Sequence, residues 1–370
     1  MASIALPKLK APQIDVRGLL ARPAVRLAGA GLLFAGCVVA LVNLLGPFGD
    51  NGLSVRVPLD ASHAPPGWRE ALKPARGGPH TYHDVVRLSE RPLAPGAPAA
   101  RSRAPAAIPF AGAGLPPAPL AGFYAPGPSG PLPIIAQDGR TPAEAYARPF
   151  KANGRPKVSL VIGGLGLNAS RTRQAIEALP PEITLSFSIY AEGLQGWIDM
   201  ARARGHEVLI EAPMEPIDFP ENDAGPYTLM ATGQPPETVK RLEWILSRAT
   251  GYFGLTNYLG SRFLATDPAY NAFASSLKAR GLAFIDDGSA ARRGGGMPRA
   301  TAERVIDDKL SGPAIDGQLA ALEAGALQRG QALGSGFAYP VTLEKVASWA
   351  VEVEQRGYQL APASALTVRR

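Results

Sequence analysis

Residues 156–170 read PKVSLVIGGLGLNAS, and this stretch decides the fold. The apolar run VSLVI at 158–162 favours a buried strand, GGLG at 163–166 favours a tight turn, and Ser170 is a candidate cap for a following helix. A strand that leads through such a turn into a helix is the repeating unit of α/β folds. The loop at the carboxyl end of the strand usually carries the chemistry. This loop contains no acid, base or nucleophile.

The same succession of strand, loop and helix continues toward the carboxyl terminus. The sequence predicts strands at 158–162, 184–188, 208–211, 254–257, 283–286, 331–336 and 358–361. It predicts amphipathic helices at 170–179, 194–204, 236–248, 268–280, 315–329 and 341–355. Strands that alternate with helices indicate a parallel sheet with right-handed crossovers. The predicted fold class is α/β, with a distorted (β/α) barrel of about seven parallel strands.

A long apolar segment lies near the amino terminus. Residues 27–46, LAGAGLLFAGCVVALVNLLG, carry no charge, and five basic side chains precede them. At 1.5 Å per residue such a helix spans about 30 Å, the thickness of the hydrocarbon core of a bilayer. The positive-inside rule predicts a cytoplasmic basic tail at 1–26 and a transmembrane helix at 27–46. A cleaved signal peptide is the alternative, although its apolar region would be shorter.

The expected location is therefore the inner (cell) membrane, single-pass, with the C-terminal domain exported to the periplasm. Residues 47–131 are rich in proline and alanine and contain few periodic apolar runs. This composition predicts a mostly disordered linker, because it cannot bury enough apolar surface to offset the entropy of ordering. Residues 132–366 then form the barrel domain.

Charge and metal-binding residue types exclude several functions. The net charge is +7, but no basic stripe interleaved with aromatic residues is visible, so no nucleic-acid partner is expected. The one cysteine, Cys37, lies in the apolar segment. Of the four histidines, only His206 falls in the expected barrel, where we predict a structural role. We therefore expect no metal site and no cofactor, and the sequence identifies no protein partner.

Polar side chains follow several of the expected strands. Glu211, Glu215 and Asp286 are candidate catalytic carboxylates, because paired acids can act as general acid and base on sugars. The alternative is that these acids cap a neighbouring helix or pair with an arginine such as Arg262. The candidate ligand-binding residues are Asn257, Tyr258, Ser261, Arg262 and Asp287.

Five stretches, taken together and in this order, resemble the divergent polysaccharide deacetylase family: VIGGLGLN at 161–168, APMEP at 212–216, NYLGSRF at 257–263, FIDDGS at 284–289 and FAYPVTLEKVASW at 337–349. The resemblance covers about 132–366. It implies a distorted (β/α) barrel and a role in carbohydrate metabolism. The related metal-dependent deacetylases use an Asp as base and an Asp with two His as metal ligands, and the metal activates the attacking water.

The resemblance also implies that these residues are replaced in this chain. The paired acids would fall at Gly163 and Gly164, one ligand histidine at Tyr258, and a late histidine at Phe337 or Ala338. Three functions stay open. The first is a membrane-anchored, exported protein that binds a polysaccharide or glycan fragment without metal-dependent deacetylation. The second is an active hydrolase or deacetylase that uses the remaining carboxylates. The third is a non-enzymatic envelope scaffold that recruits partners through the linker.

Overall fold

A computed structural model describes residues 114–369 of the protein. The predicted basic tail, the predicted transmembrane helix and most of the predicted linker lie outside these described residues. Within 114–369, no helix is long and apolar enough to cross a membrane.

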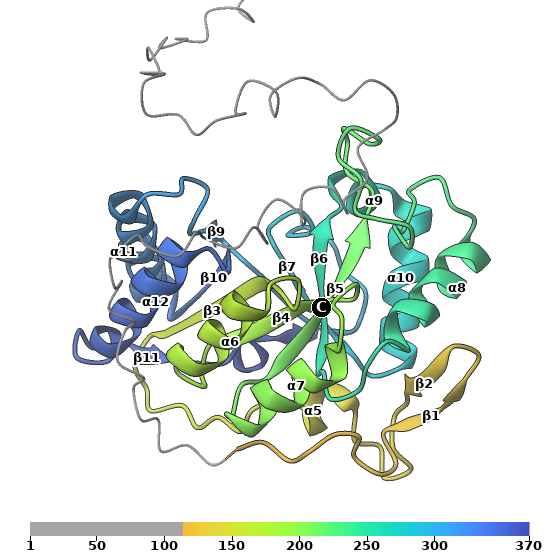
Figure 1. The fold of residues 1–370 in the computed structure, drawn as a ribbon, viewed down its shortest axis with the longest axis horizontal. Coiled ribbons are helices and arrows are strands. Elements are labelled where there is room, and N and C mark those ends of the chain that lie inside the picture. The colour runs from red at the N-terminus through yellow and green to blue at the C-terminus, as the bar shows by residue number, and fades with distance from the viewer. Residues whose placement is uncertain (1–113, 370) are drawn as a thin grey trace, which may run out of the picture. The chain divides into compact units, whose positions relative to one another are not determined.

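A 10-stranded sheet organises the domain (Figure 1). Its strands are β3 (Lys157–Leu165), β4 (Thr184–Ser188), β5 (Val208–Met214), β6 (Gly254–Leu259), β7 (Ala283–Asp286), β8 (Pro298–Thr301), β9 (Arg304–Val305), β10 (Gln331–Phe337), β11 (Gln359–Leu360) and β12 (Val368–Arg369). The strand order is β12-β8-β7-β6-β5-β4-β3-β10-β9, with β11 beside the start of β3. All pairs are parallel except β8 with β12.

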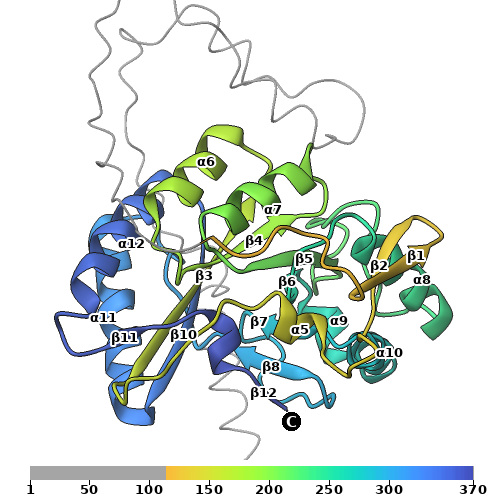
Figure 2. The same ribbon diagram turned by 90° about the horizontal axis from the view of Figure 1, so that it is seen from below.

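The sheet is curled (Figure 2), and it does not close, since the strand order ends at β9 on one side and at β12 on the other. This confirms the predicted α/β class with a parallel-rich, barrel-like sheet. The number of strands is larger than the predicted seven or so. Three of the additional strands, β8, β9 and β12, have only two to four residues, too few to show a periodic apolar pattern.

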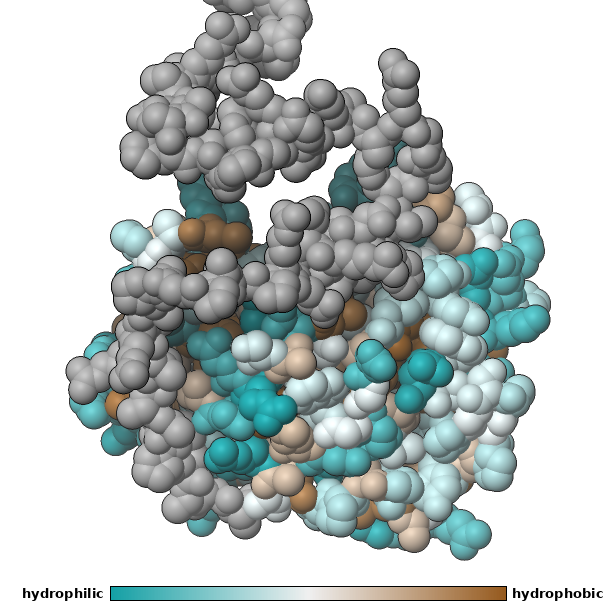
Figure 3. Space-filling view, in the orientation of Figure 1, coloured by the Kyte–Doolittle hydropathy of each residue, from teal (hydrophilic) through white to brown (hydrophobic). Residues whose placement is uncertain are grey.

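Helices cover the outside of the curled sheet. They are α6 (Ala169–Ala178), α7 (Leu194–Ala203), α8 (Pro235–Leu246), α10 (Asp267–Ala279), α11 (Gly312–Arg329) and α12 (Pro340–Val353), and each one was predicted to within a few residues. Ser170 is not the cap of α6: Asn168 takes this role, and its side chain accepts a hydrogen bond from the Arg171 amide. The face seen in Figure 3 carries mainly hydrophilic and neutral residues, as expected for helices with one apolar side.

The sheet is buried on both faces, because neighbouring side chains along a strand point to opposite sides. Leu160 and Ile162 belong to the larger apolar cluster, which lies between the sheet and the helices. Val161, between them, belongs to a second cluster together with Leu209 and Ile285. This second cluster fills the inside of the curl toward the amino-terminal ends of the strands.

Segments from both ends of the described chain complete this inner cluster. The short helix α5 (Pro142–Ala145) and the 3-10 helix η3 (Ala363–Leu366) contribute Ala143 and Leu366. The hairpin of β1 (Tyr124–Gly127) and β2 (Gly130–Pro133) precedes α5. Residues 114–131, which the sequence assigned to the end of the linker, thus include strand β1 and the buried side chains of Leu115 and Phe123.

Arg202 holds this amino-terminal segment against the barrel. Its side chain is only 1% exposed, and its guanidinium donates to the carbonyl oxygens of Pro116, Tyr146 and Gly251 at 2.9 to 3.2 Å. It also lies over the Tyr146 ring, 5.1 Å from the centroid. One cation therefore connects three segments that are distant in sequence.

We predict that Arg202→Met lowers the free energy of unfolding by about 3 kcal/mol, because three buried carbonyl groups lose a charged donor. Arg204→Met is the matched control, since Arg204 is exposed in the same turn. Denaturant unfolding of the two variants checks the prediction. Equal midpoints for both variants would show that the Arg202 contacts contribute nothing to stability.

Candidate functional site

The sequence-predicted site residues lie at the carboxyl-terminal ends of the strands, which we call the mouth of the barrel. Strands β5 and β6 point toward this end, at the top of Figure 1. Glu211 is on β5, Asn257 and Tyr258 are on β6, and Asp286 ends β7. The topology therefore brings the predicted residues to one end of the barrel, as parallel strands require.

Glu211 has no charged partner in the described part of the chain. Its Oε1 accepts hydrogen bonds from the Gly164 amide at 2.6 Å and from Ser186 Oγ at 2.9 Å. Its Oε2 receives no hydrogen bond from the described residues, and the whole residue is 6% exposed. Burial raises the pKa of this carboxyl to about 7, and the two hydrogen bonds oppose the shift. Glu211 thus changes its charge near neutral pH.

The two glycines of the opening stretch create the space that Glu211 occupies. The pairing of β3 with β4 shifts register between Ile162 and Leu165, and Gly164 has a φ of +71°. A Cβ on Gly163 would lie 2.8 Å from Ser186 Oγ and 2.9 Å from Glu211 Oε1. A Cβ on Gly164 would lie 3.1 Å from the Phe337 ring. Side chains at these two positions would collide with the present neighbours.

Glu215 joins two loops of the mouth. Its Oε1 pairs with Arg262 Nη1 at 2.8 Å, and its Oε2 accepts from the Ala231 amide at 2.7 Å. Ser261, at the start of helix α9 (Ser261–Ala265), accepts a hydrogen bond from the Ile217 amide through its Oγ. Through these contacts Glu215, Arg262 and Ser261 hold the loops together. Such a pairing of an acid with Arg262 was the sequence-based alternative to a catalytic role.

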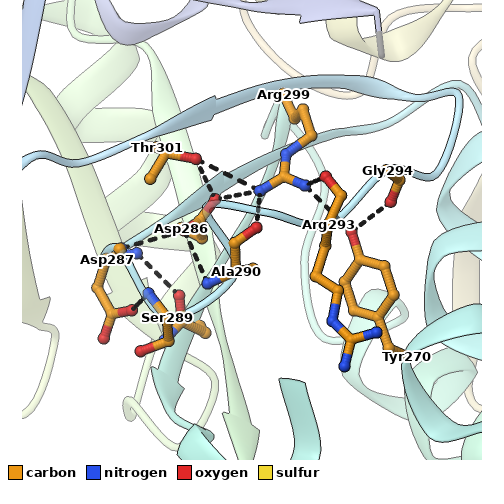
Figure 4. Close-up of polar contacts among 11 residues, drawn as sticks. Tyr270, Asp286, Asp287, Ser289, Ala290, Arg293, Gly294, Arg299 and Thr301 are labelled. Atoms are coloured by element: carbon orange, nitrogen blue, oxygen red, sulfur yellow. Dashed lines mark hydrogen bonds and ion pairs between the residues drawn. The ribbon is translucent and has the colours of Figure 1, made fainter. Parts of the chain in front are cut away.

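Asp286 lies in a buried ion pair (Figure 4). Its Oδ2 is 2.6 Å from Arg299 Nη2 and also accepts from Thr301 Oγ1 at 2.7 Å. Its Oδ1 accepts from the amides of Gly288 and Ala290, each at 3.1 Å. Both oxygens are thus occupied. Asp286 thus fixes the loop that follows β7 and pairs with an arginine, which was the alternative to a catalytic role.

The neighbouring polar groups serve the same loop. Asp287 accepts the Ser289 amide at 3.0 Å, and its own amide donates to Asn257 Oδ1 at 3.1 Å. Asn257 Nδ2 donates to the Leu259 carbonyl at 2.7 Å.

His206, predicted to be structural, is 1% exposed, with ring nitrogens 2.8 and 3.2 Å from backbone carbonyl oxygens.

Aromatic side chains are exposed at the mouth. Tyr258 is 37% exposed. Phe337, the last residue of β10, and Tyr339, two residues later, are each 38% exposed. The Phe337 and Tyr339 ring centroids are 6.3 Å apart. The sequence reasoning singled out Tyr258 as a ligand-binding candidate but assigned no such role to the other two rings.

Asp307, after β9, is a second buried carboxyl group beside Phe337. Its Oδ2 accepts from the Phe337 amide at 2.7 Å and from Thr342 Oγ1 at 3.0 Å, and its Oδ1 is buried with no hydrogen-bond partner. Burial raises the pKa of Asp307 above its usual value. Strand β9, which precedes Asp307, has only two residues and therefore gives no periodic signal in the sequence.

A cavity of about 540 Å³ lies at the opposite, amino-terminal end of the barrel. Its lining includes Arg148, Lys157, Phe253, Ser364 and Arg369. The Arg148 guanidinium pairs with Glu182 at 2.8 Å. None of the sequence-predicted site residues lines this cavity.

Comparison with known proteins identifies the class and then the family. Residues 160–367 match the family described as divergent polysaccharide deacetylase, which is more than half of the chain. The curled α/β sheet and the order of the strand-end motifs define a barrel of the carbohydrate deacetylase type. The chain belongs to the divergent polysaccharide deacetylase family.

Solved structures with this fold include an uncharacterized protein from Agrobacterium tumefaciens C58, with 36% identity and a TM-score of 0.62, over 64% of this chain and 99% of that one. The catalytic domain of a peptidoglycan N-acetylglucosamine deacetylase from Eubacterium rectale has 15% identity and a TM-score of 0.41, over 60% and 94%. A CE4 family pseudoenzyme from Bacillus anthracis has 12% identity and a TM-score of 0.38, over 58% and 66%. No curated protein matches the chain significantly.

The mouth does not fit the metal of metal-dependent deacetylases. No group of three or more His, Cys, Asp or Glu side chains within 114–369 could hold a metal ion. Gly163 and Gly164 offer no side-chain donor, and Phe337 offers no ligand atom. Any added acid at 163 would meet the Glu211 carboxyl. The chemistry of this mouth therefore has to be derived from Glu211 and the aromatic rings.

We expect Arg299→Met to lower the free energy of unfolding by about 4 kcal/mol, because Asp286 is left as a buried, unpaired charge. The double variant Asp286→Asn with Arg299→Met should recover part of this loss, since it removes that charge. Chemical denaturation of the wild type, Arg299→Met and the double variant measures both effects. A double variant that is no more stable than Arg299→Met would contradict the ion-pair role.

A second prediction concerns pH. The folded-state pKa of Glu211 is raised from 4.5 to about 7, so the unfolded chain loses this proton first, and stability falls as pH rises between these values. Glu211→Gln cannot lose the proton. The free energy of unfolding of Glu211→Gln, taken relative to that of the wild type, should therefore increase by about 3 kcal/mol between pH 4 and pH 8. Unfolding measured for both proteins across this range tests the sign, and a constant difference would contradict it.

Proposed function

We propose that the protein is a membrane-anchored, exported carbohydrate-binding protein of envelope polysaccharide metabolism that does not carry out metal-dependent deacetylation. The observation that carries the proposal is the content of the mouth. Glycines stand at 163 and 164, and aromatic rings stand at Tyr258 and Phe337, where the family resemblance implies the base and the metal ligands. Membership of a polysaccharide deacetylase family supports a glycan as the ligand.

Exposed aromatic rings are suited to sugars, because the C–H face of a sugar ring packs on an aromatic face. Phe337 and Tyr339 form one such surface, and Tyr258 lies four strands away in the order β6-β5-β4-β3-β10. At about 4.8 Å between strands, this is up to about 19 Å along the curled sheet. An oligosaccharide is long enough to contact both surfaces even at this upper limit. The preferred ligand is therefore a polysaccharide or a glycan fragment.

The entry point of the chain supports a tethered arrangement. Leu115, near the start of the described residues, donates its amide to the Arg202 carbonyl at 2.8 Å, at the end of α7. This is the amino-terminal end of the barrel, opposite the mouth. The described chain thus enters the domain at the end opposite the proposed ligand surface.

Hydrolysis is a second candidate function, and one observation favours it. Glu211 has a pKa of about 7, the value that suits a general acid or base near neutral pH. Glu215 and Asp286 are held by arginines, so this hydrolase would depend on Glu211 alone. The scaffold alternative depends on 47–113, outside the described residues.

Binding of the full-length protein to oligosaccharides by isothermal titration calorimetry tests the proposal. We expect binding of cell-wall-type glycans without zinc-dependent release of acetate. Phe337→Ala should weaken binding about tenfold, or about 1.4 kcal/mol, through loss of the stacking surface. Tyr124→Ala is the matched control, because Tyr124 is 41% exposed on the distant hairpin.

Two results would refute the proposal. Zinc-dependent acetate release by the wild type would show that deacetylation is retained. Failure of every tested glycan to bind would remove the binding function itself. Cleavage of a glycan that Glu211→Gln abolishes, at unchanged stability, would instead establish the hydrolase.

A further inference from the structure

Two carboxyl groups at the mouth have no cationic partner. Glu215 pairs with Arg262 and Asp286 pairs with Arg299, but none of the ion pairs in the described part of the chain includes Glu211 or Asp307. Both residues are only 6% exposed. A buried carboxylate is costly unless a cation and hydrogen bonds compensate it. Such groups therefore mark a position where an external cation would be stabilised.

Glu211, Asp307 and Phe337 are linked through backbone groups. Gly164 donates its amide to Glu211 Oε1 at 2.6 Å, and a Cβ on Gly164 would be 3.1 Å from the Phe337 ring. The Phe337 amide donates to Asp307 Oδ2 at 2.7 Å. Glu211 and the Phe337 ring thus both lie beside Gly164, and Asp307 is held by the backbone of Phe337.

This arrangement is complementary to an organic ammonium group on an apolar ring. Glu211 Oε2 has no donor among the described residues, so it keeps its capacity to accept a hydrogen bond from an ammonium N–H. The Phe337 ring attracts a cation to its face as well. Asp307, bound to the Phe337 amide, adds negative potential, although its unpartnered Oδ1 is itself buried. A neutral N-acetyl group would leave both carboxyl groups uncompensated.

We propose that the mouth selects amino sugars whose nitrogen is free, with Glu211 binding the sugar ammonium and Phe337 packing under the sugar ring. The preferred ligand is then a deacetylated glycan, which is the product of the chemistry of metal-dependent relatives and not its substrate. This inference rests on the proposed glycan-binding function and names its ligand class.

The binding has a defined dependence on pH. The groups that face Glu211 are uncharged: Gly163 and Gly164 on β3, Ser186 on β4, and Thr256, its partner in the register with β6. Its ionisation is therefore controlled mainly by burial, with a pKa of about 7. Binding requires the ionised carboxylate and the protonated amine together. Affinity should rise as pH increases toward 7 and fall again where the amine loses its proton.

The test is calorimetric titration of the full-length protein with two ligands, the β-1,4-linked tetramer of glucosamine and its fully N-acetylated counterpart. At pH 7 we expect the glucosamine tetramer to bind at least tenfold more tightly. This comparison uses the wild type, so it does not depend on a variant that folds. Glu211→Gln should reduce the preference to about onefold.

Asp308→Asn is the matched control, because it removes an exposed negative charge next to Asp307 without touching Glu211. It should keep the preference. Equal affinity of the wild type for both tetramers would overturn the ammonium inference and leave the proposed glycan binding intact. Binding of neither tetramer overturns the inference and counts against the proposed function. A preference that survives in Glu211→Gln would also overturn the role of Glu211.

Discussion

The mouth of this barrel depends on the contact between a buried carboxyl group and the backbone amide of a glycine. Glu211 Oε1 is held by the Gly164 amide and Ser186 Oγ, in space that a side chain at 163 would occupy. The carboxyl on β5 and the missing side chains on β3 are therefore two parts of one arrangement. A side chain at 163 would therefore require Glu211 and Ser186 to shift.

The other acids of the mouth have a different character. Glu215 and Asp286 each have an arginine and backbone amides as partners, and together they fix the loops after β5 and β7. Glu215 and Asp286 are thus committed to these loops, whereas Glu211 Oε2 has no hydrogen-bond donor among the described residues. A group held in place by such loops is a better basis for selective binding than a mobile one would be.

Much of the fold could be predicted from sequence, because strands such as VSLVI at 158–162 carry a continuous apolar signal and lie at regular spacing. The partners of the site residues could not. Arg299 lies on β8, a short strand without periodicity, so its pairing with Asp286 has no local signal. Leu115 and Phe123 are buried in a stretch whose proline content indicates a linker. The ion pair and the buried linker residues both depend on packing between segments distant in sequence, which local composition does not reveal.

The open sheet also has a consequence for aggregation between molecules. Its two edges are the strands β9 and β12, each two residues long and each with an arginine, Arg304 or Arg369. Short charged edges offer few backbone groups for a strand of another molecule to join. An open barrel with such edges can therefore resist aggregation at high local protein concentration, because its unpaired edge strands are too short to pair with strands of other molecules.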